Sequence, residues 1–185
     1  MNQAVDRPEP PVEVSSQAEA EPGTGLGAGL AAAISASALV VPMLLSLSTT
    51  PTPNHPRVFL WYRTLRQPAF KPPDVAIPVA WTVIESFLAA GAYRLLRKPS
   101  SPARNRSLAL LAGNVVAIGA WSRLFFGRRN LPASTVAAAA LIGTGAAYVA
   151  QAKKVDTPAA AAGLPLTAWV AFATVLTAAI WRLNR

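Results

Sequence analysis

Long apolar stretches alternate with short polar or basic segments along the chain after residue 25. A hydrocarbon core about 30 Å thick is crossed by about 20 apolar residues in helical conformation. Five stretches meet this length, near 26–47, 75–96, 107–126, 131–151 and 158–182. The pattern therefore predicts an all-α membrane protein, a bundle of five transmembrane helices joined by three tight loops and one long one.

A water-soluble helical bundle is the alternative interpretation of these stretches. Helices on the surface of a soluble protein keep one polar face toward water. The stretches 26–47 and 131–151 contain no charged residue and offer no such face. We therefore expect a multi-pass membrane protein.

The first 25 residues differ in character from the rest of the chain. They hold five acidic residues against one basic residue, several prolines and no aromatic residue. Such a segment buries too little apolar surface to fold by itself. We expect a disordered acidic tail at 1–25, followed by one membrane domain at 26–185.

Charge refines this division. Because the first 25 residues are net acidic, the remainder carries a net charge of +13 against +9 for the whole chain, and its basic residues gather near the ends of the expected spans. The two ends of the bundle carry similar numbers of Lys and Arg, so the positive-inside rule gives no orientation. This distribution does not resemble a nucleic-acid footprint, which would place the basic residues on one soluble face.

The absence of Cys excludes disulfides and thiol catalysis, and we find no metal-ligand cluster in the sequence.

The segment 48–74 is the one long connection, and it has a pattern of its own. Six prolines surround a short amphipathic stretch in which Val58, Trp61, Tyr62 and Leu65 recur at helical spacing. This stretch is either an interfacial helix with aromatics at headgroup depth or a lid over the mouth of the bundle. Long structured loops more often carry a function than serve only as connections.

Three blocks of sequence resemble one known family. The segments WYRTLRQPAFKPP at 61–73 and PVAWT at 78–82 are similar to the first loop and second helix of the TspO/MBR family, the tryptophan-rich sensory or translocator proteins. The segment WSRLFFG at 121–127 is similar to that family's third helix. The segments WVAFATVL at 169–176 and WRLN at 181–184 are similar to its last helix. The resemblance covers roughly 58–184, in order, and excludes the acidic tail.

This resemblance implies a five-helix bundle with a ligand cavity under the first loop, assembled as a homodimer in membrane lipid. Members of the family bind porphyrins such as protoporphyrin IX, and some bind sterols and benzodiazepine-type ligands. Transport, stress sensing and light-dependent porphyrin breakdown are proposed roles. The resemblance thus implies a tetrapyrrole as ligand, with no resident cofactor required and no nucleic-acid partner. Abundant Ala and Arg favour a bacterial membrane.

Helical spacing independently predicts an aromatic pocket, because residues three and four apart share a helix face. One face joins Trp81 to Glu85, and a second is formed by Trp169, Ala173 and Leu176. Together with the positions that the resemblance places in the cavity, the expected ligand-binding residues are Tyr62, Trp81, Glu85, Asn114, Ile118, Trp121, Phe125, Trp169, Ala173 and Leu176.

Two positions depart from the family pattern. Ile118 stands where the family usually has Asn, and Asn114, one turn away, could supply an amide about 6 Å lower. Glu85 replaces a family aromatic inside a span, where an ionisable group costs roughly 2.5–3.5 kcal/mol on insertion scales. Glu85 either bonds to a neighbouring helix or lines the ligand site. Arg123 could pair with it, but it lies nearer its helix end and is expected to reach the interface.

We therefore expect a membrane protein that binds a planar hydrophobic ligand for sensing, sequestration or transport. One alternative is a light-dependent porphyrin-degrading catalyst in which Trp81 and Trp169 handle the redox chemistry. Another is a divergent membrane scaffold without ligand, an interpretation that Ile118 and Glu85 motivate.

Overall fold

The structure is a computed structural model that describes residues 24–185. The acidic tail predicted at 1–25 lies almost wholly outside the described residues. The described part of the chain is helical and contains no strand. Its elements are α1 (Ala28–Ser35), α2 (Ser37–Ser46), α3 (Pro56–Thr64), α4 (Ala76–Leu96), α5 (Pro102–Ser122), the π-helix η1 (Arg123–Gly127), α6 (Leu131–Ala152), α7 (Thr157–Ala161) and α8 (Leu164–Leu183).

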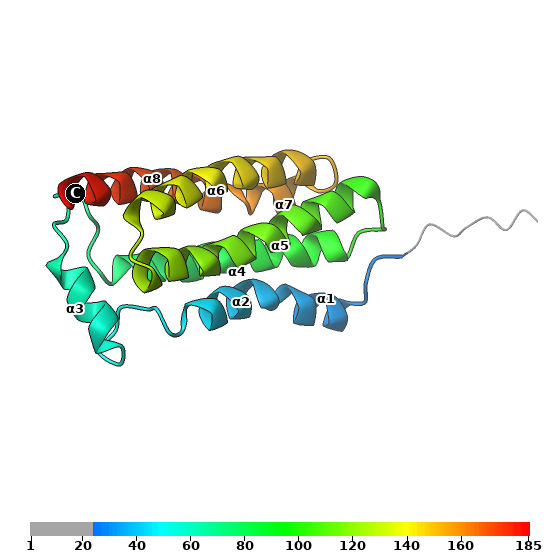
Figure 1. Ribbon diagram of the computed structural model, residues 1–185. Coiled ribbons are helices and arrows are strands. Elements are labelled where there is room, and N and C mark those ends of the chain that lie inside the picture. Colours follow the sequence, from blue (N-terminus) through cyan, green and yellow to red (C-terminus); the bar gives the residue numbers. More distant parts are fainter. Residues whose placement is uncertain (1–23) are drawn as a thin grey trace, which may run out of the picture.

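Five helical units are long and apolar enough to cross a membrane, as the sequence predicts. They run over Ala28–Ser46, Ala76–Leu96, Pro102–Gly127, Leu131–Ala152 and Thr157–Leu183. Figure 1 shows these units side by side, with α3 lying across one end of the bundle beside the C-terminus. The segment that the sequence singled out as a candidate lid is therefore a short helix at one mouth of the bundle.

The first span is broken into α1 and α2 by a turn at Ala36. Pro42 lies less than two turns later inside α2 and has no N–H to donate to the preceding turn. Ser35 donates its hydroxyl to the Ala31 carbonyl at 2.7 Å, a bond that competes with the helical ladder and favours bending. The sequence predicts one continuous helix here, and the break follows from these two local effects.

The last span is also divided, with the short α7 preceding α8 across Ala162 and Gly163. Gly163 lies against the Tyr148 ring, where an added Cβ would come within 2.5 Å of Cδ1. A Cβ added at Gly91 on α4 would likewise lie 2.5 Å from the hydroxyl oxygen of the same tyrosine. Tyr148 is fully buried and donates to the Ala159 carbonyl at 2.8 Å. Two glycines thus make room for one large side chain that joins α4, α6 and α7.

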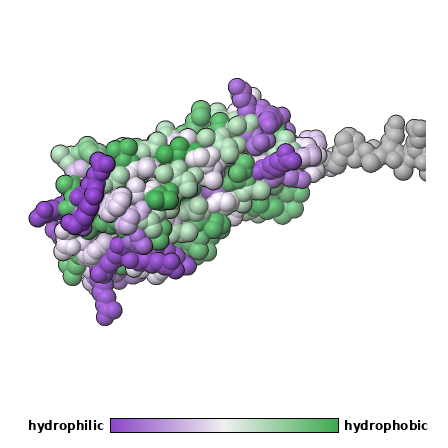
Figure 2. Space-filling view, turned by 45° about the horizontal axis from the view of Figure 1, so that its top comes forward, coloured by the Kyte–Doolittle hydropathy of each residue, from purple (hydrophilic) through white to green (hydrophobic). Residues whose placement is uncertain are grey.

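The surface has the character expected of a membrane bundle. Figure 2 shows hydrophobic residues over the middle of the molecule and hydrophilic residues concentrated toward its two ends. Large apolar side chains are exposed along the spans, with Val136 at 70%, Val175 at 60% and Val83 at 48%. Exposed apolar surface of this extent fits contact with lipid rather than water.

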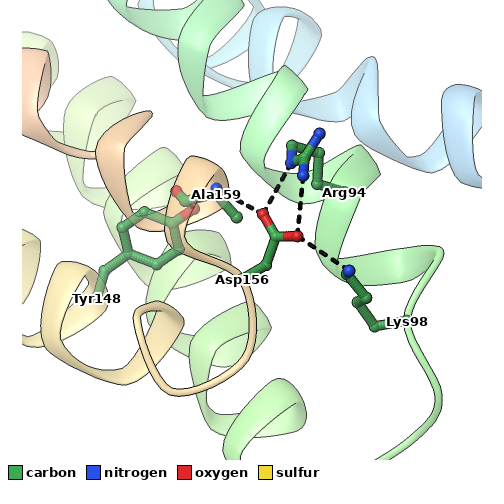
Figure 3. A network of polar contacts seen from close by, with 5 residues as sticks. All are labelled: Arg94, Lys98, Tyr148, Asp156 and Ala159. Carbon is green, nitrogen blue, oxygen red and sulfur yellow. Dashed lines mark hydrogen bonds and ion pairs between the residues drawn. The ribbon is translucent and has the colours of Figure 1, made fainter.

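A polar network fastens the bundle at the end opposite α3 (Figure 3). The Asp156 carboxylate accepts two hydrogen bonds from Arg94, at 2.7 and 3.0 Å, and lies 3.1 Å from the Lys98 ammonium. It also accepts from the Ala159 backbone N–H at 2.8 Å and so caps α7. The Arg94 hydrogen bonds, helped by those from Ala159 and Lys98, lower the pKa of Asp156. The network ties α4 to the start of the last span.

Candidate functional site

Two tryptophans from different helices meet at the core of the bundle. Trp81 on α4 and Trp169 on α8 contact each other edge to face, with ring centroids 6.3 Å apart and an interplanar angle of 81°. Both are half-buried and pack against the main apolar core, which contains Ile118. The sequence placed both tryptophans well inside their spans, and the structure brings them together.

The aromatic contacts continue from this pair to the long loop. Trp169 lies 5.5 Å from Phe172 between ring centroids, and Phe172 lies 6.4 Å from Phe70. Phe70 belongs to the segment between α3 and α4 and is 51% exposed. A row of four aromatic rings therefore runs from the interior pair out to the loop. Phe70 and Phe172 were absent from the predicted site, although both lie in the sequence blocks that resemble the family.

A second apolar cluster gathers four of the other expected residues. Tyr62, Trp121, Phe125 and Leu176 lie in it together with the neighbouring aromatic Phe126. Trp121 stacks on Phe125 at a centroid distance of 5.0 Å, and Tyr62 meets Phe126 edge to face at 5.5 Å. Burial in this cluster raises the pKa of the Tyr62 hydroxyl. The structure thus divides the expected residues into two clusters.

Helix α8 contributes to both clusters. Trp169 belongs to the first and Leu176 to the second, two turns further along the same helix. Ala173 lies between them and is half-buried. This small side chain separates the two bulky positions along α8.

The π-helix η1 explains how two consecutive phenylalanines enter one cluster. Phe125 and Phe126 both lie in η1 and pack edge to face at 4.8 Å. A π-helical turn inserts an extra residue into the helix, and such turns occur often at functional sites. Just before it, the Trp121 indole N–H donates to the Ser134 carbonyl on α6 at 2.9 Å, which fixes the ring between α5 and α6.

Asn114 uses its side chain to join two helices. It is 1% exposed, donates to the Leu110 carbonyl at 2.9 Å, and accepts from the Thr144 hydroxyl on α6 at 2.7 Å. Both ends of the amide are therefore engaged within the protein. The idea that Asn114 replaces the amide missing at Ile118 stays a prediction.

Glu85 lies one turn after Trp81, in the middle of α4, and is half-buried. Among residues 24–185, no hydrogen bond or ion pair joins its carboxyl group to another side chain. Arg123, the possible partner, instead donates to the Leu45 carbonyl at 2.8 Å. Whether Glu85 contacts a ligand stays a prediction.

The loop over these clusters is held by polar contacts. Lys71 lies with its ammonium 5.4 Å from the Tyr62 ring centroid and forms an ion pair with Asp74. Asn184, at the end of α8, accepts a hydrogen bond from the Arg66 backbone N–H and donates one to its carbonyl. Asn184 lies in a family-like block of the sequence, but no local pattern indicates this role.

Metal-binding side chains do not gather in the described part of the chain. No group of three His, Cys, Asp or Glu residues lies close enough together within residues 24–185 to hold an ion. His55 lies at the start of α3, with Nδ1 3.3 Å from the Thr52 hydroxyl. The described residues around the tryptophan pair offer aromatic surface, with Glu85 one turn along α4 from Trp81 and Phe70 of the loop at the end of the aromatic row.

Comparison with known proteins identifies relatives of this arrangement. The TspO/MBR family model matches residues 34–182. The translocator protein of Ovis aries is 30% identical over 129 residues, which are 69% of this chain and 76% of the relative. Protein CrtK of Rhodobacter capsulatus is 28% identical over 129 residues, covering 67% and 78% of the two chains. The tryptophan-rich sensory protein of Cereibacter sphaeroides is 27% identical over 124 residues, covering 67% and 77%.

Proposed function

This chain belongs to the TspO/MBR family, and we propose that it binds a porphyrin or related tetrapyrrole between α4 and α8, under the loop that follows α3. Binding would serve sensing, sequestration or transport of the ligand. The names translocator protein and tryptophan-rich sensory protein describe transport and sensing for the relatives that carry them, and we extend these roles to this chain as part of the proposal.

The contact between Trp81 and Trp169 carries the proposal. Two half-buried indole rings from separate helices meet at nearly a right angle against the apolar core of the bundle. Aromatic side chains bind flat rings by offset stacking and edge contacts, which are favourable beyond the area that they bury. A planar macrocycle could replace the contact between the indoles if α4 and α8 separate slightly. The four-ring row out to Phe70 would then extend the same aromatic surface to the loop.

A titration with protoporphyrin IX tests this proposal. We expect saturable binding to the purified protein in detergent, followed by the shift of the Soret absorbance band. Replacement of one stacking surface, Trp81→Ala or Trp169→Ala, should weaken binding about tenfold, given the energies of aromatic contacts and of buried ring area. Phe87→Ala is the matched control, because Phe87 is an exposed aromatic residue on α4 that belongs to neither apolar cluster. Equal affinities for all four proteins would contradict the site.

A light-dependent breakdown of the porphyrin is the second candidate function. The closeness of two oxidisable indoles favours it. A photoexcited macrocycle could accept an electron from an indole and pass it to dioxygen, which becomes superoxide. The indole radical would then regain its electron from the macrocycle, and superoxide would add to the oxidised macrocycle, so that the net change is addition of one dioxygen to the porphyrin. Illumination of the complex in air should then bleach the Soret band, and Trp81→Phe or Trp169→Phe should stop bleaching while binding persists. Binding without bleaching would leave the protein as a binder.

Two further expectations can be tested with the same preparation. If wild-type protein shows no saturable binding, the ligand proposal is wrong and the membrane-scaffold alternative is favoured. Assembly as a homodimer, which the family resemblance implies, is tested by light scattering of the purified protein after gel filtration, with the detergent mass subtracted.

A further inference from the structure

The outward side of α5 and α6 carries two neighbouring hollows that share Ala117 in their lining. The first has a volume of about 520 Å³ and the second about 660 Å³. Ala109 and Gly113 line the first and Ala120 lines the second, and all three residues are exposed. Neither hollow is lined by Trp81 or Trp169. The two hollows therefore form a surface groove along α5 that is separate from the Trp81–Trp169 pair, although Trp121 of the second cluster lines one side of the second hollow.

Small and apolar residues line the middle of this groove. Ala117, Ala120 and Ala137 leave space beside the larger Leu141. The small side chains leave the groove open along α5, so a long flexible molecule could lie in it in van der Waals contact with the protein.

The end of the groove near α3 is cationic and carries hydroxyl groups. Arg123, Arg128, Ser48 and Thr49 line it, beside Gly127. Arg123 uses Nε to donate to the Leu45 carbonyl at 2.8 Å. This bond holds the side chain in place and leaves its Nη groups available for other hydrogen bonds. Arg128 is exposed. This end of the groove therefore offers two guanidinium groups and a serine hydroxyl as hydrogen-bond donors to a phosphate group.

Carboxylates of the described residues do not pair with these arginines. None of the residues that line either hollow is acidic. In the described residues, Asp74 pairs with Lys71, and Asp156 pairs with Arg94 and Lys98. No ion pair in that same part of the chain involves Arg123 or Arg128. Within residues 24–185, no acidic side chain pairs with these arginines, which leaves them available to an external anion.

We propose that an anionic phospholipid binds in this groove, with its phosphate between Arg123 and Arg128 and an acyl chain extending past Ala120 to Ala117. The length of the groove agrees with this occupant. The path from Arg128 to Ala117 is at most about 16 Å at 1.5 Å per residue, because it includes the π-helix η1, which rises less per residue, and this is about half of a hydrocarbon core of about 30 Å. The cationic end thus lies at headgroup depth and the apolar part within one leaflet.

A second copy of the chain is the competing occupant, because small residues often mark helix interfaces in membranes. A two-fold dimer packed through this groove repeats the same surface on both subunits. It would bring the arginines of each copy toward those of the other without an intervening acid in the groove. Like charges at short range oppose such packing, whereas an anionic headgroup neutralises them.

Native mass spectrometry of the purified full-length chain with added lipid tests the proposal. We expect wild type to bind phosphatidylglycerol more tightly than phosphatidylcholine. Arg128→Gln should weaken phosphatidylglycerol binding about fivefold, as expected for one cation at a lipid headgroup, and Arg128→Lys should restore most of it. Arg182→Gln is the matched control, since Arg182 is exposed at the same end of the bundle on α8 and lines neither hollow. Ala120→Leu, which fills the groove, should lower the affinity for both lipids.

Four outcomes would overturn the proposal. The first is equal affinity of wild type for the two lipids, and the second is an equal loss in Arg128→Gln and Arg182→Gln. The third is a groove that binds a second copy, shown if Ala120→Leu turns a dimer into a monomer in light scattering without changing lipid affinity. The fourth is tested by adding inorganic phosphate at millimolar concentration to the lipid-bound protein. Displacement of the lipid by phosphate alone would mean an anion site without an acyl groove. Thermal melting of each variant checks that it is folded.

Discussion

The side-chain amide of Asn184 pairs with the backbone of Arg66 through two hydrogen bonds. Asn184 Nδ2 donates to the Arg66 carbonyl, and Asn184 Oδ1 accepts from the Arg66 N–H, each at 2.9 Å. The amide thereby bonds to both backbone polar groups of Arg66, as the backbone of a neighbouring β-strand would, and fastens the loop that follows α3 to the end of α8. This pairing spans the chain from its long loop to its C-terminus and holds the loop over the aromatic clusters.

Removal of this pairing should loosen the loop without unfolding the bundle. Asn184→Ala leaves two backbone groups of Arg66 to bond with water, and each lost hydrogen bond costs about 1 kcal/mol. We expect hydrogen exchange at 65–75 to accelerate about tenfold or more, with the spans unchanged. Porphyrin binding and release should both become faster.

Asn105→Ala is the control for this change. Asn105 is exposed at the opposite end of the bundle, where its side-chain amide donates to the Ser100 hydroxyl at 3.4 Å. Its replacement should leave exchange at 65–75 as in wild type. Identical exchange at 65–75 in Asn184→Ala and wild type would show that the pairing does not hold the loop.

Glu85→Gln tests whether the intramembrane carboxyl group takes part in ligand binding. Gln keeps the size of Glu but cannot titrate, so any dependence of binding on the charge of Glu85 should disappear. We expect the affinity for protoporphyrin IX to vary with pH differently in the variant and in wild type, measured by Soret titrations between pH 5 and 9. Ser86→Ala, on the adjacent exposed position of α4, is the control. Superimposable profiles for wild type and Glu85→Gln would place Glu85 outside the site.

The network at Asp156 predicts a loss of stability in acid. Its pKa is lowered in the folded protein, mainly by the Arg94 hydrogen bonds, while an unfolded Asp has a pKa near 3.9. Because the folded pKa is the lower one, the contribution is complete well above about pH 4 and is lost as the pH falls through and below that value. Wild type should therefore melt at progressively lower temperature below about pH 4.

Asp156→Asn provides the comparison for this pH effect. It removes the charge that Arg94 and Lys98 share and should lower the melting temperature at neutral pH by several degrees, because one partner of each ion pair is lost. The stability gap between variant and wild type should narrow in acid. A gap that stays constant from pH 7 to pH 3, in melts followed by circular dichroism, would contradict the assignment.

The space around Tyr148 makes one glycine intolerant of a methyl group. In Gly163→Ala the new Cβ would lie 2.5 Å from Tyr148 Cδ1 and 2.9 Å from Val149 Cγ2. Overpacking of this kind costs about 1–3 kcal/mol, so the melting temperature should fall by several degrees. Gly143→Ala, also in an apolar span, meets nothing within 4 Å and should be neutral or slightly stabilising. Equal melting temperatures for the two variants would contradict the packing of Tyr148.

The five spans, the short helix in the long loop and the family could be predicted from the sequence. Each depends on information that is local along the chain. A run of about 20 apolar residues determines a span because the bilayer sets the length. The recurrence of Val58, Trp61, Tyr62 and Leu65 determines the helical face of α3 because the helix period is fixed. Trp81 and Trp169 could be placed inside their spans by counting residues from the polar ends.

The partners of these residues depend on how the spans pack, which no local pattern specifies. The sequence indicates Asn114 as a possible ligand amide, yet its oxygen accepts from Thr144, which is 30 positions away on α6. Phe70 and Asn184 belong to family-like blocks, and only packing shows that one meets Phe172 and the other Arg66. The groove with two arginines at one end likewise arises from residues of several helices and their connections together.

The sequence by itself thus determined the number of spans, their approximate positions and the kind of side chains that face inward. The tertiary structure decided which of those side chains touch. Hydrophobic length acts along one helix at a time, so it can be read from the chain. Contacts between helices depend on rotation and depth, which are set jointly by small residues such as Gly163, by large ones such as Tyr148, and by polar ties such as that of Asp156 to Arg94.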